Sequence, residues 1–186
     1  DITLEHLLTM TWGYEWPGDY FLADPNHPLW LWKEEDERFD QALNRKKGHE
    51  PGEFFLYDST SSHCLSGVIT EATGISTFEF AQANLFEPLG IQQADGEPIV
   101  WKQDPKGFYE GGFGLELTPR QMAKLGYLIL NNGYWQGQQI VSKAWVEAAT
   151  AQQVETKIPS TGLTHYGYQW WMGPDREYFH AYGYGG

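Results

Sequence analysis

A tyrosine and a cluster of small hydroxyl side chains meet where an extended pattern in the sequence gives way to a helical one. The apolar residues 54–56 favour an extended segment, and Tyr57 and Ser59 follow directly. Helical spacing of apolar residues begins just after Ser61 and Ser62. A phenol and a hydroxyl two residues apart at such a turn could serve a reaction. Equally, the tyrosine ring could pack and the serine could begin a turn or a helix cap.

Other common signatures of catalysis are missing from the 186 residues. The sequence has no P-loop for phosphate, no His-Glu-x-x-His zinc motif and no Gly-x-Ser-x-Gly nucleophile elbow. Its six histidines are scattered, and no two are four residues apart. The single cysteine, Cys64, falls on an apolar helical face, where a cysteine is usually a core residue. We therefore predict a buried thiol, no metal site and no disulfide.

The composition and net charge argue against some classes of partner but do not identify a specific one. Hydrophobic residues make up 41% and aromatic residues 16% of the chain, which is enough for a packed core. The net charge of −13 repels phosphate backbones and anionic lipid, so we expect no nucleic-acid partner and no membrane partner. No apolar run approaches the roughly 20 residues that a membrane-spanning helix needs. The oligomeric state is left open.

Helical patterns with clear start and stop signals occupy most of the first 150 residues. Thr3, Ser76 and Thr118 are candidate capping residues, and Thr118 is followed by a proline at the first helical position. No element is predicted over residues 91–117. The predicted helices begin near residues 3, 34, 61, 77, 119 and 142.

The C-terminal part changes character. Residues 166–172 are aromatic and extended, residues 173–176 favour a turn, and residues 177–186 favour a returning strand. Because a two-stranded hairpin is marginal on its own, we expect its sheet to continue in sequence outside this chain. We predict an α+β domain that is mostly helical over 1–165 and forms a sheet hairpin over 166–186.

Four blocks of sequence follow one another in an order that resembles a known superfamily, at residues 2–13, 51–74, 85–91 and 111–133. The superfamily is that of the serine β-lactamases, penicillin-binding proteins and carboxylesterases, with the class C β-lactamases as the nearest type. The resemblance implies a β-lactamase/transpeptidase-like fold, represented here by the helical subdomain and a hairpin of the central antiparallel sheet. It also implies a serine hydrolase that acts through an acyl-enzyme on ester, amide or β-lactam bonds, without a cofactor.

The same resemblance assigns roles to residues of the opening segment and of the hairpin. Tyr57 is implied to be the base that activates a serine, with its proton affinity lowered by a nearby lysine, and Ser59 to hold that lysine or the substrate. His180 would take the cationic or hydrogen-bonding position on the sheet edge. A backbone N–H near Tyr182 or Gly183 would supply an oxyanion donor. Here the sequence departs from the family pattern, since Tyr182 stands where the motif has glycine.

The nucleophile motif of that family, Ser-x-x-Lys, is not found, because no serine in the chain has a lysine three residues later. The resemblance therefore leads us to expect the nucleophile on a helix upstream of this chain, and a fragment that is inactive alone. It also suggests a periplasmic or extracellular location. The substrate is expected to be a small molecule or a peptide.

The aromatic residues near the start of the chain allow two interpretations. Trp12 and Tyr14 lie in a segment resembling a loop at the family's cleft, so they could form an apolar wall for substrate. Alternatively they fill the core. A protein of this fold without catalytic activity, which binds peptide or carbohydrate, is the competing hypothesis for function.

Overall fold

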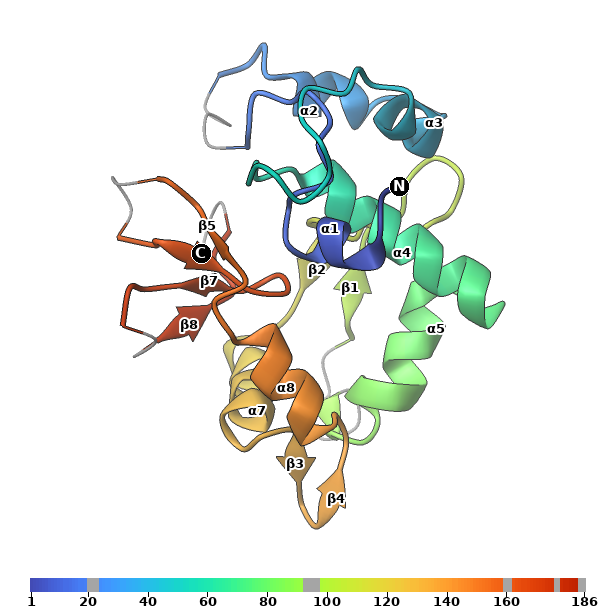
Figure 1. Cartoon of the computed structure of the whole chain (residues 1–186). Helices are drawn as coiled ribbons and strands as arrows, with labels where there is room; N and C mark the ends of the chain where they lie inside the picture. The colour runs from blue at the N-terminus through green and yellow to red at the C-terminus, as the bar shows by residue number, and fades with distance from the viewer. Residues whose placement is uncertain (20–23, 92–97, 159–161, 176–177, 184–186) are drawn as a thin grey trace. The chain divides into compact units, whose positions relative to one another are not determined.

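The computed structural model describes residues 1–19, 24–91, 98–158, 162–175 and 178–183 (Figure 1). The chain forms two compact units. The first combines Asp1–Leu65 with Ala148–Gly186, and the second is Ser66–Glu147. The first unit thus joins the sheet to the N-terminal helices. The division of the chain at residue 165 stays a prediction. The architecture is α+β, as predicted.

Short helices make up the N-terminal part of the first unit. They are α1 (Leu4–Leu8), α2 (Pro28–Trp32), α3 (Arg38–Leu43) and the first turns of α4 (Ser59–Thr73). Thr3 caps α1 as predicted, since its hydroxyl accepts the His6 N–H while the His6 ring accepts the Thr3 N–H. Helix α4 starts at Ser59, before the predicted serines, because the Asp58 carboxylate accepts the Thr60 N–H at 2.9 Å and caps the helix.

A four-stranded antiparallel sheet completes the first unit (Figure 1). Its strands are β5 (Val154–Glu155), β6 (His165–Tyr166), β7 (Trp171–Met172) and β8 (Phe179–His180), paired in chain order. A hairpin of β7 and β8 is confirmed, but the predicted strand over 166–172 is wrong, because Tyr166 belongs to β6 and pairs with Trp171. Two further strands of this chain lie beside the hairpin. The register places Val154 opposite Tyr166, Tyr166 opposite Trp171, and Trp171 opposite His180. Directly opposed residues project from the same face, so these four form one row across the sheet.

The second unit contains α5 (Thr77–Ala81), a π-helical turn over Gln82–Phe86, and α7 (Pro119–Leu130). Two small hairpins accompany them: β1 (Val100–Trp101) with β2 (Leu115–Glu116), and β3 (Tyr134–Trp135) with β4 (Gln138–Gln139). Helix α8 (Lys143–Ala149) begins in this unit. Ser76 and Thr118 form capping boxes at the starts of α5 and α7, which confirms both predicted starts.

The helix predicted to begin near residue 34 is much shorter in the structure. It runs only from Arg38 to Leu43. At its end the Arg45 side chain turns back and donates from Nε to the Ala42 carbonyl at 3.2 Å. This bond satisfies a carbonyl at the helix end. Beyond it the chain is extended, and Lys47 forms an antiparallel bridge with Tyr14.

Three clusters of buried apolar residues form the core of the described parts of the chain. One in the first unit surrounds Trp12 and includes Leu7, Tyr14, Ala42 and Cys64. A second, the aromatic cluster, lies on the sheet and consists of Met10, Phe55, Leu163, Tyr166 and Trp171, with Tyr57 packed against it. The third fills the second unit with Phe86, Leu89, Ile91, Ile99 and Leu128.

A glycine allows the N-terminal segment to approach the loop after α3. Gly13 has a φ of +88°, and its carbonyl accepts the N–H groups of Gly48 and His49. A Cβ at this position would lie 2.5 Å from the His49 carbonyl oxygen. We expect Gly13→Ala to lower the free energy of unfolding by about 1–3 kcal/mol, measured by urea denaturation.

The control for this substitution is Gly74→Ala. Gly74 also has a positive φ, +72°, but an added Cβ there meets no atom within 4 Å. The difference between the two variants therefore isolates the steric clash from the backbone strain. An equal loss of stability in both variants would contradict the close approach at Gly13.

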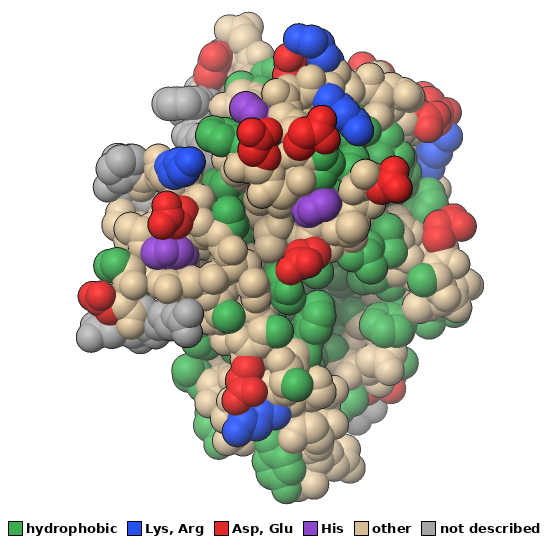
Figure 2. Space-filling view, in the orientation of Figure 1, with side chains coloured by type: hydrophobic (Ala, Val, Ile, Leu, Met, Phe, Trp, Pro, Cys, Tyr) green, Lys and Arg blue, Asp and Glu red, His purple; other side chains and the backbone are tan. Residues whose placement is uncertain are grey.

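The surface is acidic, in keeping with the composition. Asp and Glu side chains are spread over the face shown in Figure 2 and do not gather in one patch. Within the described parts of the chain, no helix has the length and apolarity required to cross a membrane.

Candidate active site

Tyr57 lies at the turn into α4, where its ring faces the sheet of the first unit. The ring is half-buried and packs against Trp171 at a centroid distance of 4.9 Å and against Tyr166 at 6.1 Å. Its neighbours are therefore aromatic side chains of β6 and of β7, which is the first strand of the terminal hairpin. The catalytic roles of Tyr57 and Ser59 stay predictions.

The surroundings of Tyr57 favour the protonated phenol. Burial raises the pKa of Tyr57 above its usual value, and the negative charge of Asp19 raises it further. A hydrogen bond with the Trp171 side chain acts in the opposite direction. A phenol in this state holds its proton and can donate a hydrogen bond, and it can act as a base only if a nearby cation lowers its pKa.

Asp19 joins Tyr57 and Ser59 through the main chain. Its backbone N–H donates to the Tyr57 carbonyl at 2.9 Å, and its Oδ2 accepts the Ser59 N–H at 2.6 Å. The other carboxylate oxygen accepts the Trp16 Nε1–H at 2.7 Å. The Asp19 residue is only 7% exposed. Sequence reasoning missed this residue, which lies about forty positions before the turn it contacts.

A buried ion pair supports the same turn from the other side. Asp58 is fully buried, and its Oδ2 accepts from Arg45 Nη2 at 2.7 Å and from Trp12 Nε1 at 3.1 Å. Its Oδ1 accepts both the N–H and the hydroxyl of Thr60. Burial raises the pKa of Asp58, while Arg45 and the Thr60 hydroxyl act to lower it. The Asp58 carboxylate thus points into the protein and forms its hydrogen bonds there with Arg45, Trp12 and Thr60.

Arg45 lies against the aromatic residues of the N-terminal segment. Its guanidinium is 4.8 Å from the ring centroid of Trp12, 5.9 Å from that of Tyr14 and 4.5 Å from that of Trp16. Trp12 and Tyr14 are both buried, and their rings pack edge to face. Their burial corresponds to the core interpretation and not to an apolar wall open to substrate.

His180 lies on the face of the sheet that Tyr57 covers. It is directly opposite Trp171 in the register, and Trp171 contacts the Tyr57 ring. Among the described residues, the buried Nε2 atom of His180 has no hydrogen-bond partner. The sheet therefore brings the predicted histidine and the predicted base to the same face, with Trp171 between them. The catalytic role of His180 stays a prediction.

The proposed oxyanion segment follows β8. Tyr182 is 60% exposed, and its ring lies 5.9 Å from that of His180. Gly183 is exposed, with open space where a Cβ would be. The oxyanion role of Tyr182 or Gly183 also stays a prediction, and residues 176–177 and 184–186 of the predicted turn and strand lie outside the described part of the chain.

Cys64 is buried in the cluster around Trp12, which confirms the predicted core position. Burial raises the pKa of its thiol to about 12, so the group is protonated near neutral pH. The described residues contain no group of three or more His, Cys, Asp or Glu arranged to hold a metal ion.

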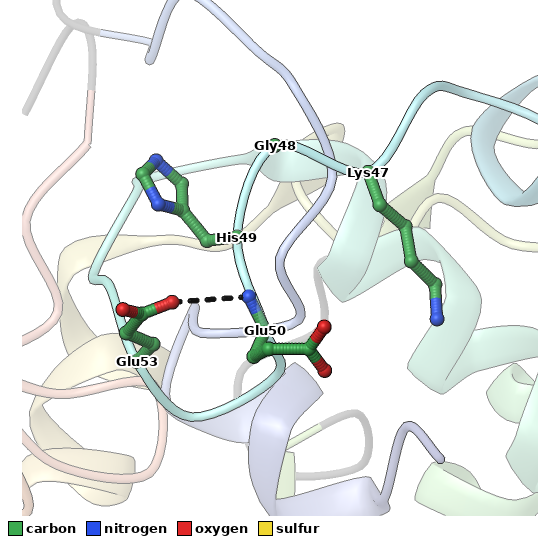
Figure 3. A pocket seen from close by; sticks show the side chains of 5 residues that line it. All are labelled: Lys47, Gly48, His49, Glu50 and Glu53. Carbon is green, nitrogen blue, oxygen red and sulfur yellow. Dashed lines mark hydrogen bonds between the residues drawn. The ribbon is translucent and has the colours of Figure 1, made fainter.

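A cavity of about 280 Å³ lies at the loop after α3 (Figure 3). It is lined by Lys47, Gly48, His49, Glu50 and Glu53. One hydrogen bond crosses it, from the Glu50 N–H to the Glu53 carboxylate at 3.2 Å, and Lys47 lies apart from the other side chains. None of the predicted site residues lines this cavity, so it adds nothing to the arrangement around Tyr57.

Comparisons with known proteins agree with the resemblance. A family model described as Beta-lactamase matches residues 1–186. A 6-aminohexanoate-dimer hydrolase of Paenarthrobacter ureafaciens is 28% identical over 123 residues, which cover 63% of this chain and 30% of that protein.

Solved structures are similar as well. A "Putative 6-aminohexanoate-dimer hydrolase from Bacillus anthracis" matches with a TM-score of 0.74 and 25% identity over 94% of this chain. A penicillin-binding protein homologue from Pyrococcus abyssi, at 22% identity and a TM-score of 0.65 over 93% of this chain, shares the fold. This chain spans 48% and 44% of those two chains, which is about half of each.

Proposed function

The chain belongs to the Beta-lactamase family, and we propose on this premise that the full protein is a serine hydrolase that works through an acyl-enzyme. The observation that carries the proposal is the placement of Tyr57. Its phenol lies at the start of α4, half-buried against the sheet, with Ser59 two residues on and His180 on the same face. Relatives named as hydrolases support the same reaction class.

In the proposed reaction, a serine oxygen attacks the carbonyl carbon of an ester or amide while its proton passes to Tyr57. The bond to the leaving group then breaks, and Tyr57 returns the proton to that group. Water hydrolyses the resulting ester and regenerates the serine. The base must be deprotonated at the start, so a cation has to offset the burial and the Asp19 charge that raise the pKa of Tyr57.

The attacking serine is proposed to lie in sequence outside this chain. None of the serines in the 186 residues is followed three positions later by lysine, the spacing that puts both side chains on one helix face. A lysine from that outside motif would also be the cation that lowers the pKa of Tyr57. On this proposal the 186 residues alone do not turn over substrate. No cofactor is needed for this chemistry.

Ester and amide bonds are the proposed targets, ahead of β-lactams, because histidine takes the third-motif position here. Two similar proteins are named for a dimer of 6-aminohexanoate. Joining the amine of one such unit to the carboxyl of the other gives an amide, which fits this substrate class. We further propose a periplasmic or extracellular location.

The test is covalent labelling of the full-length protein with a fluorophosphonate probe, which reacts with activated serines. We expect one labelled serine, located by mass spectrometry in a Ser-x-x-Lys motif upstream of Ile2. The control is the same protein unfolded in urea, in which no serine should react. Absence of labelling in the folded protein would contradict the serine hydrolase and favour a protein of this fold without catalytic activity.

A further inference from the structure

We infer that Asp19 is a positioning residue for Tyr57, which fixes the turn that carries the phenol and sets the charge that the phenol experiences. This inference rests on the proposed function, because it concerns the base of the proposed reaction. Nothing in the sequence pattern marks Asp19, which follows a Pro-Gly pair and falls within no recognised motif.

The geometry supports a role in positioning. Asp19 binds the residues on both sides of Asp58, accepting from the Ser59 N–H at 2.6 Å and donating from its own N–H to the Tyr57 carbonyl at 2.9 Å. Together these two bonds fix the main chain before and after the capping residue. From this turn the Tyr57 ring extends to Trp171, at a centroid distance of 4.9 Å.

Asp19 itself is held in place. Its carboxylate accepts from the Trp16 indole at 2.7 Å, and the neighbouring Gly18 carbonyl lies 3.0 Å from Nε2 of His27. At 7% exposure its charge is little screened by water. Among the described residues, no lysine or arginine forms an ion pair with it. The carboxylate is thus a fixed negative charge near the phenol.

Several other ionisable groups also face Tyr57 or its turn. Tyr166 and His180 belong to the same face of the sheet, and the Asp58–Arg45 pair lies behind the turn. Asp58 is already paired with Arg45. Asp19 is therefore the group whose removal changes the charge near the phenol while the row of residues on the sheet stays intact.

The experiment measures the pH dependence of kcat/KM for p-nitrophenyl acetate with the full-length protein. Asp19→Asn keeps the size of the side chain but removes its charge. Loss of a negative charge stabilises the phenolate, so the rising limb of the profile should move to lower pH. Loosening of the turn should also lower kcat at the plateau on the order of tenfold to a hundredfold, with little change in KM.

Two further variants separate charge from packing. Glu15→Gln removes a carboxylate from the same segment, but from an exposed pair with Lys46, and should leave the profile unchanged. Asp19→Glu keeps the charge but displaces it, so kcat should fall while the limb stays near its original pH. This second variant also keeps the inference testable if Asp19→Asn does not fold, as judged by thermal unfolding.

The outcomes distinguish the inference from the proposed function. The inference is supported if the rising limb of the pH profile moves to lower pH in Asp19→Asn and keeps its position in Asp19→Glu and Glu15→Gln. If the rising limb keeps its position in Asp19→Asn, the inference about Asp19 is overturned. Loss of activity in Tyr57→Phe would still support Tyr57 as the base in that case. Full activity of Tyr57→Phe would instead overturn the base assignment, and the inference with it.

Discussion

Replacing Tyr57 with phenylalanine should lower kcat/KM of the full-length protein on the order of 10²- to 10⁴-fold, the usual contribution of a general base. The substitution removes one hydroxyl and keeps the ring that packs against Trp171 at 4.9 Å. The fold should therefore survive while proton transfer is lost. The measurement is steady-state hydrolysis of p-nitrophenyl acetate, together with thermal unfolding to check the fold.

The matched control is Tyr166→Phe. Tyr166 belongs to the same aromatic cluster, is 2% exposed and also packs against Trp171 at 4.9 Å. Loss of its hydroxyl should lower stability by about 1 kcal/mol, as for one hydrogen bond, and should leave most of the activity. If both variants lost activity equally, disturbance of the aromatic cluster would explain the result, and Tyr57 would not be the base.

The largest effect on stability is expected from Arg45→Met. This change leaves the fully buried Asp58 carboxylate without its cation, and breaking such a buried pair costs about 3–5 kcal/mol. Loss of the guanidinium beside Trp12 and Trp16 adds to this cost. The free energy of unfolding should be measured by urea denaturation at pH 7 and again at pH 5.

The pH dependence has a definite sign. Burial already raises the pKa of Asp58, and removal of Arg45 raises it further. A carboxyl with a folded pKa above its unfolded value contributes most to stability at low pH, and this contribution is lost as the pH rises through the folded pKa. The loss in Arg45→Met should therefore be smaller at pH 5 than at pH 7.

A double substitution provides the control. In Arg45→Met with Asp58→Asn, no charge is left buried and unpaired, so most of the stability should return. A double variant as unstable as the sum of the two single variants would show that the two side chains act independently. That result would contradict a coupled pair.

Local signals in the sequence predicted much of the fold. Thr3, Ser76 and Thr118 cap helices where the pattern indicated, because a cap depends on residues three positions apart. The terminal hairpin followed from its aromatic strands and its Gly-Pro turn. Helix α2 was missed because His27 caps it, and histidine is not among the usual capping residues. Strands β1 to β4 have two residues each, too few for any alternation to appear.

The candidate site was only partly predictable. Tyr57 and Ser59 stand in a recognisable motif, and the register of the sheet then places His180 on the same face. Asp19 and Arg45 were missed because charged residues are usually exposed, and no local pattern indicates which of them are buried. Both lie far in sequence from the turn they contact, by 40 positions for the Asp19–Ser59 bond and 13 for the Arg45–Asp58 bond. Trp12 and Tyr14 fill the core, with the Arg45 guanidinium beside both rings.

The buried ion pair behind the turn also bears on how this family diversifies. A protein with a single mutation at position 45 or 58 would be unstable, because either change alone leaves a buried charge or hydrogen-bond donor without its partner. The two positions should therefore change together across evolutionary time or not at all. Residues on the open side of the turn carry no such constraint, so new specificities can arise there while the support behind Tyr57 stays the same.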